Sequence, residues 1–111
     1  MSTVYKICAA AEWARSEVTG IVPASADDQR DGFIHLSTSE QLDGTISRHF
    51  LDQDDLMLLA IDPEKLGASL RWEPSRGGAL FPHCYGPIQI AAVTWARPLD
   101  RAHPGQTIGA S

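Results

Sequence analysis

Apolar and polar positions follow strand-like and helix-like patterns in turn along this chain. Residues 4–8 and 70–73 alternate as half-buried strands do, and the apolar run 56–61 is typical of a central strand covered on both faces. Residues 91–99 predict a last strand. In the first strand we interpret Lys6 as an edge lysine that reaches water; the alternative is a cation in a binding site. In 70–73, Leu70 and Trp72 are expected to point inward.

Two amphipathic helices are predicted from apolar side chains at helical spacing. The first has a stripe from Ala10 to Val18 that includes Trp13, and Gly20 is placed to end it. The second runs from about residue 38 to residue 50. Between them lies a loop, in which Ser25 is spaced to cap one helical turn with the residue three positions later.

Residues 31–38 contain a turn signal, a strand signal and a helix-start signal in succession. Ser37 and Thr38 are each followed three residues later by Glu or Gln, which fits the capping box. His35, two hydroxyls and the free N–H groups of a helix start would then lie close together, as in an anion or ribose site. The alternative is a hydrogen-bonded core histidine beside two residues that only cap the helix.

Residues 75–87 are rich in glycine and proline and predict a loop, yet they include three aromatic side chains. Such a loop either covers one end of the core or forms a wall or lid for a ligand. If it meets residues 31–38, polar groups from separate segments converge on one site. The candidate catalytic residues are His35, Glu73 and His83, and the candidate ligand-binding residues are Ser37, Thr38, Arg71, Ser75, Arg76, Phe81 and Tyr85.

Length and element order predict one α+β domain, because the 111 residues suffice for a single core and the strands and helices do not alternate regularly. We expect residues 1–99 to form the globular domain and residues 100–111 to form a polar C-terminal tail that frays.

Composition argues against several classes of function. The net charge is −5 and the nine basic residues are scattered, which disfavours an extended nucleic-acid surface. No apolar run is long enough to span a membrane and the first residues do not resemble an export signal, so we expect a cytoplasmic protein. Two cysteines give no disulfide framework, and no His or Cys pair has the spacing of a zinc site, so no metal is assigned.

Three segments resemble the signatures of a small family called domain of unknown function 952: residues 31–38, 72–75 and 81–87. The resemblance extends from Tyr5 to about Leu99. It implies a fold of the ADP-ribosylation class, with a split antiparallel sheet and short helices, and it brings no known activity with it.

Residues 34–37 are also similar to a segment of RNA 2′-phosphotransferases, which share that fold and use NAD. By this likeness His35 would lie where the ribose or phosphate of the ligand binds. ADP-ribosyltransferases generally use a glutamate on a late strand, however, and no glutamate follows Glu73 here. Lys6 stands where a histidine or arginine would be expected. The resemblance therefore favours a nucleotide-sized pocket over transferase activity.

We therefore expect a pocket around His35 that binds NAD, ADP-ribose or another small nucleotide-like metabolite, with ADP-ribosyl or phosphoryl transfer as its potential chemistry. A second hypothesis is a noncatalytic module in which the loop 75–87 contacts a protein partner. A third is hydrolysis with Glu73 and a histidine as acid and base.

Overall fold

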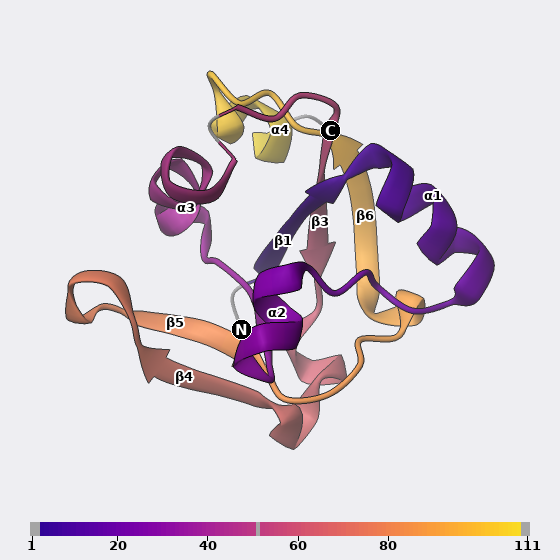
Figure 1. The fold of residues 1–111 in the computed structure, drawn as a ribbon, viewed down its shortest axis with the longest axis vertical. Coiled ribbons are helices and arrows are strands. Elements are labelled where there is room, and N and C mark those ends of the chain that lie inside the picture. The colour runs from indigo at the N-terminus through magenta and orange to yellow at the C-terminus, as the bar shows by residue number, and fades with distance from the viewer. Residues whose placement is uncertain (1–2, 51, 110–111) are drawn as a thin grey trace.

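The computed structural model describes residues 3–50 and 52–109, apart from the side chain of Arg76. Within these residues the strands form two antiparallel three-stranded sheets (Figure 1). The larger sheet has the order β1 (Val4–Ala9), β3 (Leu56–Ile61), β6 (Val93–Pro98). The smaller one has the order β2 (Ile34–His35), β5 (Leu80–Cys84), β4 (Leu70–Pro74). The predicted α+β class is confirmed.

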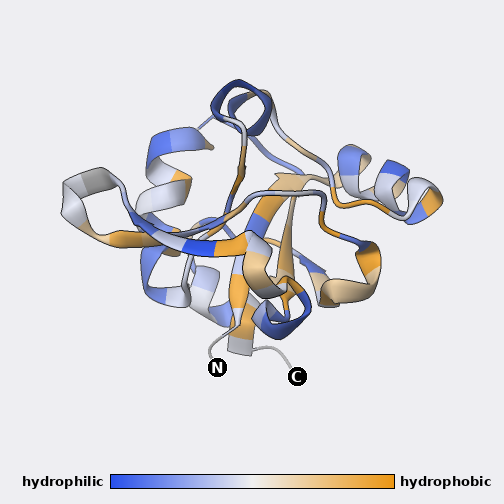
Figure 2. Ribbon diagram, turned by 90° about the horizontal axis from the view of Figure 1, so that it is seen from below, coloured by the Kyte–Doolittle hydropathy of each residue, from blue (hydrophilic) through white to orange (hydrophobic). Residues whose placement is uncertain are grey.

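The larger sheet is covered on both faces, and its central strand β3 is the most deeply buried. Leu59 and Ile61 pack into one apolar cluster, and Leu58 and Ala60 into a second. All four are fully buried, as the unbroken apolar run predicted. The first cluster also takes side chains from α1 (Ala10–Thr19) and the smaller sheet, and the second from α3 (Leu42–His49) and α4 (Pro104–Gly109). Figure 2 shows the apolar residues concentrated on the strands and the polar ones on the peripheral helices.

Helix α1 has the predicted bounds, but its buried face differs from the prediction. Trp13 packs against the first core cluster as expected, whereas Val18 is 88% exposed and Ser16 is buried. The helix ends at Gly20, which is left-handed with φ 80° and donates its N–H to the Ser16 carbonyl. This turn leads the chain into an antiparallel bridge at Ile21, so the side of α1 that carries Ser16 faces inward.

The smaller sheet contains two departures from the sequence-based expectations. Residues 80–84, expected within a loop, form its central strand β5. Gly77 and Gly78 have positive φ and turn the chain between β4 and β5, so the predicted loop is irregular at this turn and again at residues 85–87. Trp72 was expected to point inward but is 44% exposed, since β4 is an edge strand with neighbours on one side only.

The end of the described chain is folded, so the expectation that it frays is wrong for residues 104–109, which form α4. Thr107 is buried and its hydroxyl accepts the N–H of Asp100. The Arg97 guanidinium donates to the carbonyls of Thr107 and Ile108, and Ile108 packs on the second core cluster. Side-chain to backbone hydrogen bonds of this kind leave no apolar periodicity, so no helix could be predicted here from the sequence. No helix among residues 3–50 and 52–109 has both the length and the apolar character of a membrane span.

Candidate functional site

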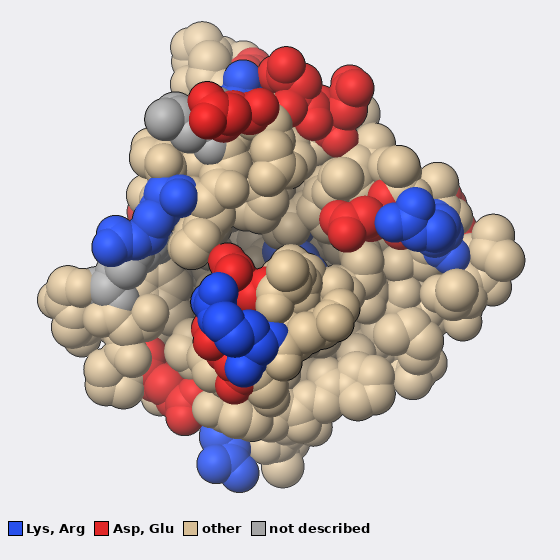
Figure 3. Space-filling model, in the orientation of Figure 1, with Lys and Arg blue, Asp and Glu red and all other residues tan. Residues whose placement is uncertain are grey.

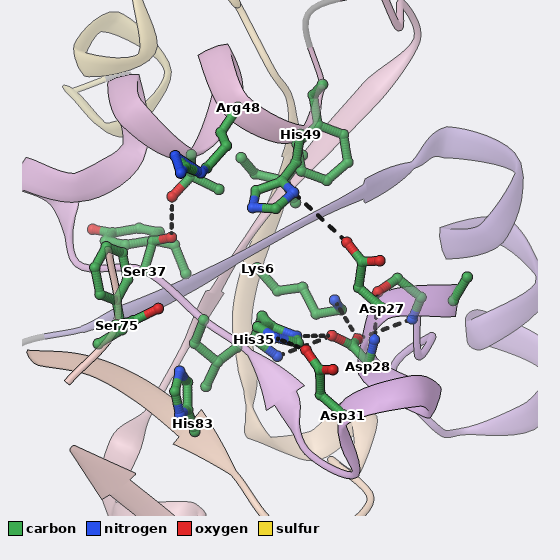
Figure 4. A pocket seen from close by; sticks show the side chains of 18 of the residues that line it. Lys6, Asp27, Asp28, Asp31, His35, Ser37, Arg48, His49, Ser75 and His83 are labelled. Carbon is green, nitrogen blue, oxygen red and sulfur yellow. Dashed lines mark hydrogen bonds and ion pairs between the residues drawn. The ribbon is translucent and has the colours of Figure 1, made fainter. Parts of the chain in front are cut away.

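A cavity of about 450 Å³ lies between β1, α3, the smaller sheet and α2 (Ala26–Asp31). Figure 3 shows a hollow beside the charged side chains that gather over α2, and Figure 4 shows the side chains around it. The volume falls in the range of roughly 300 to 1,000 Å³ typical of small-molecule sites. Five of the ten candidate residues from the sequence line the cavity: His35, Ser37, Ser75, Phe81 and His83.

Asp28, on α2, fixes one wall of the cavity. One of its carboxylate oxygens accepts hydrogen bonds from the backbone N–H and the Nδ1 of His35, at 3.0 and 2.7 Å. The other accepts from Lys6 Nζ and from the Ser25 N–H, both at 2.9 Å. Burial raises the pKa of Asp28, but the hydrogen bonds from His35 and the charge of Lys6 outweigh it and hold the pKa well below its ordinary value. Asp28 is therefore a fully satisfied, ionised side chain.

His35 is held on both ring nitrogens by carboxylates of α2. Nδ1 faces Asp28 at 2.7 Å and Nε2 faces Asp31 at 3.0 Å. The hydrogen bond to Asp28 raises the pKa of His35, against the opposing effect of burial. Since carboxylates only accept, both nitrogens donate and the ring is an imidazolium in this arrangement. His35 therefore serves as a charged link between β2 and α2, with neither nitrogen available as a base.

The favoured interpretation of Lys6 as a snorkelling edge lysine is wrong. Its side chain is 4% exposed and its ammonium is paired with Asp28 at 2.9 Å. β1 is an edge strand, but it bridges to Ser37 and so joins the two sheets, which shuts Lys6 off from water. Lys6 lines the cavity, with its charge already committed to α2.

His83, on β5, forms the opposite wall with a carboxylate behind it. Its Nδ1 lies 2.8 Å from Glu73 Oε1 on the neighbouring strand β4, and the same oxygen accepts the Tyr85 hydroxyl at 2.8 Å. These two hydrogen bonds lower the pKa of Glu73. Arg71 lies over the Tyr85 ring, 5.1 Å from its centroid. Glu73, Arg71 and Tyr85 are thus grouped around His83 but outside the cavity lining.

Phe33 connects the two walls. Its ring stacks on His83 with centroids 4.1 Å apart and planes at 26°, and it contacts His35 at 4.6 Å and Tyr85 at 5.2 Å. The two histidine rings lie 5.7 Å apart. One phenylalanine therefore contacts both histidines, although it lies outside the cavity lining.

The third side of the cavity comes from α3, which the sequence argument left without a role. Arg48 and His49 line the cavity (Figure 4). His49 Nδ1 lies 3.6 Å from Asp27 of α2. Arg30 pairs with Asp27 and Asp31. Among the described side chains, Arg48 forms no ion pair with a carboxylate.

The remaining candidates have local roles. Ser37 bonds to Thr45 Oγ1 at 2.9 Å instead of capping the helix, although it still lines the cavity. The Thr38 N–H donates to Gln41 Oε1, one half of the expected capping box, but Thr38 lies outside the cavity lining. The side chain of Arg76 is outside the described part of the chain. No cluster of three or more metal-ligating side chains occurs among the described residues.

Comparisons with known proteins place the chain among proteins without an assigned activity. Residues 7–96 match the model of a family described as Protein of unknown function (DUF952). This confirms the family resemblance of residues 31–38, 72–75 and 81–87. No protein of curated function matches the chain.

The chain is also similar to solved structures of protein CC0527 from Caulobacter crescentus. Its crystal structure has a TM-score of 0.85 at 46% identity, over 89% of this chain and 87% of that one. A crystal structure of a double mutant gives 0.85 at 45% identity over the same shares. The solution NMR structure gives 0.78 at 47% identity, over 90% and 86%.

Proposed function

This chain belongs to the DUF952 family of proteins of unknown function, and we propose from the geometry of its cavity that it binds a small nucleotide-like metabolite. NAD, ADP-ribose and nucleoside monophosphates are the ligands we consider. The proposal rests on one observation above all: side chains from β1, α2, α3, β2 and β5, distant in sequence, line one hollow that holds a cation without a carboxylate partner among the described residues.

Arg48 is the group we assign to the anionic part of the ligand. The other cations of the cavity wall are committed, since Lys6 is paired with Asp28 and Arg30 with two aspartates. The guanidinium of Arg48 faces no such competitor in the described chain. A planar fork of donors suits phosphate, which it binds with two parallel hydrogen bonds. A ligand phosphate would therefore bind most favourably at Arg48.

Aromatic side chains supply the apolar part of the site. Phe81, Tyr5 and Phe50 line the cavity, and the first two are largely buried. A nucleobase has two apolar faces and gains free energy by leaving water for such a surface. A phosphate at α3 and a base against these rings would bring the sugar between the walls formed by His35 and His83.

The committed carboxylates favour binding of a phosphate-bearing ligand over ribosyl transfer. Asp27, Asp28 and Asp31 line the cavity, and each is paired with a cation or a histidine. Glu73 lies behind His83, outside the lining. Positive charge developing on a ribose carbon would thus face no uncommitted carboxylate among the described residues. The two small antiparallel sheets are compatible with an ADP-ribosylation-like fold, which we keep as part of the proposal.

Titration calorimetry with NAD, ADP-ribose and AMP tests the proposal. We expect measurable binding to the wild type for at least one of these ligands. Arg48→Ala should weaken that binding about 10- to 100-fold, the usual effect of a lost hydrogen bond to a charged group. Arg15→Ala, on the exposed side of α1, is the matched control and should leave it unchanged. Absence of heat with all three ligands at millimolar concentration would contradict the proposal.

A second candidate function is a noncatalytic module that contacts a protein partner through the β4–β5 hairpin. The observation in its favour is that Trp72, Leu80 and Tyr85 are 44%, 53% and 41% exposed. Under this hypothesis His35→Ala lowers the melting temperature and changes no ligand affinity, because none of the three ligands binds to begin with.

A further inference from the structure

We propose that His83 Nε2 accepts a hydrogen bond from a sugar hydroxyl of the bound metabolite, so that the site selects a ribose over a deoxyribose. The inference rests on the proposed function and specifies which part of the ligand the second wall recognises. Glu73 is a positioning residue in this arrangement, because it acts through His83.

The tautomer of His83 is set by its partner on β4. Glu73 is ionised, since its hydrogen bonds lower its pKa, and a carboxylate can only accept. The proton must therefore reside on Nδ1, 2.8 Å from Glu73 Oε1. A neutral imidazole protonated on Nδ1 has its lone pair on Nε2. In this neutral form the second nitrogen is an acceptor.

Nε2 is available to a ligand. His83 is 95% buried, at 5% relative exposure, yet its ring borders the cavity and points into it (Figure 4). Within residues 3–50 and 52–109 no side chain or backbone group bonds to Nε2, and no nitrogen or oxygen atom of a buried side chain there is sealed without a partner. A buried acceptor that opens only onto the cavity needs a donor from whatever occupies that cavity.

The donor we assign is a hydroxyl. The Phe33 ring packs on one face of the imidazole at 4.1 Å, which fixes the ring plane and thus the direction of the Nε2 lone pair. Tyr85 holds the same oxygen of Glu73 and restrains the carboxylate. His35, 5.7 Å away, offers donors only and cannot play the same part. Across the cavity Arg48 favours a phosphate, so a phosphorylated sugar provides both an anion and hydroxyl donors.

AMP, 2′-deoxy-AMP and 3′-deoxy-AMP form the matched set of probes. By calorimetry we expect at least one deoxy compound to bind the wild type about five- to tenfold more weakly than AMP, the range for one lost hydrogen bond. In His83→Ala that difference should vanish. His103→Ala, an exposed histidine near α4, should keep it. Equal affinity of the three probes for the wild type overturns the inference and leaves the proposed function standing. No binding of AMP, when NAD and ADP-ribose also fail, overturns both.

Nitrogen NMR of the unliganded protein tests the tautomer directly, even if His83→Ala does not fold. Long-range proton–nitrogen spectra should show His83 protonated on Nδ1 and unprotonated on Nε2. In Glu73→Gln the amide can also donate to Nδ1, so the Nε2-protonated form should appear and the preference for AMP over its deoxy analogues should shrink. A wild-type ring protonated on Nε2 overturns the inference.

Discussion

The two histidine walls of the cavity are built from the same parts, an imidazole and a carboxylate, with different results. On the α2 wall, both ring nitrogens of His35 contact carboxylates, those of Asp28 and Asp31, and the charged ring helps to hold the fold together. On the β4–β5 wall, one ring nitrogen of His83 is hydrogen-bonded to Glu73 and the other faces the cavity. The first arrangement stabilises a helix against a strand, and the second prepares an acceptor.

The difference follows from how many partners surround each carboxylate. Asp28 is buried and accepts four hydrogen bonds, including that of the buried Lys6. Glu73 is a third exposed and accepts two, both through one oxygen. Removing one group from a buried, fully bonded network leaves its partners buried without a hydrogen bond. When an exposed group is removed, water can take over its hydrogen bonds. Mutations should therefore affect folding at the first wall and ligand recognition at the second.

Asp28→Asn should have the largest effect. It removes the charge that compensates the buried Lys6, and breaking a buried ion pair on one side costs about 3 to 5 kcal/mol. Urea unfolding measures the loss as a lower midpoint. Asp52→Asn, on an exposed turn, is the control and should change stability by less than about 0.5 kcal/mol. The double variant Lys6→Met with Asp28→Asn should be more stable than Asp28→Asn alone, because no buried charge is left unpaired. Wild-type stability in Asp28→Asn would show that the two walls do not differ as described.

Phe33→Ala should come second, because Phe33 touches both walls at once. Its ring contacts His83, His35 and Tyr85, and it is only partly buried. We expect a loss of about 2 kcal/mol, below the roughly 3 to 5 kcal/mol of a fully buried phenylalanine. Unfolding curves give the stability, and nitrogen NMR shows whether His83 still bonds to Glu73. An undisturbed His83 would mean that Glu73 alone orients the ring.

The pH dependence of stability should separate the walls next. The pKa of His35 is raised above 6.5, so its contribution is complete below pH 6.5 and is lost as the pH rises through the raised pKa. The pKa of Asp28 is lowered from 3.8, so its contribution is present above pH 3.8 and is lost as the pH falls toward the lowered value. The pKa of Glu73 is also lowered, and its contribution disappears only on the acid side.

The measurement is the difference in unfolding free energy between the wild type and His35→Gln across this range. That difference should be largest between about pH 4 and 6.5 and should shrink toward alkaline pH. The corresponding difference for Glu73→Gln should not shrink on the alkaline side. Identical profiles for both variants would contradict the distinction between the walls.

The part of the fold that could be predicted from sequence is the part determined by apolar periodicity. All six residues of the run 56–61 are apolar, which predicted a central strand. From Leu58 to Ile61 they are fully buried. β5 was missed because its glycine-rich approach and Pro82 resemble a loop, although the following residues pair with two strands. α4 was missed because it is held by hydrogen bonds to Arg97 and Asp100, which no local pattern reveals.

Half of the candidate residues for the site line the cavity, and the pairings among its charged groups could not be predicted from the sequence. His35, Ser37, Ser75, Phe81 and His83 do meet in one cavity. The ion pair between Lys6 and Asp28 could not be predicted, because the two residues are 22 positions apart in the sequence. The role of Asp28 as partner of the Ser25 cap was already a sufficient local explanation for its presence. Arg48 was overlooked because a basic residue in the last turn of a helix is unremarkable in sequence.

Tyr85→Phe should have the smallest effect and therefore defines the lower end of the comparison. The substitution removes one hydroxyl on a half-exposed side chain and keeps the ring contacts with Phe33 and Arg71. Glu73 then retains His83 as its donor, so its pKa should rise toward the ordinary value without reaching it. Carbon NMR of the Glu73 carboxyl follows that titration, and the urea midpoint should scarcely move. A large loss of stability would mean that the β4–β5 wall stabilises the fold as the α2 wall does. The distinction between a structural His35 and a ligand-binding His83 would then no longer hold.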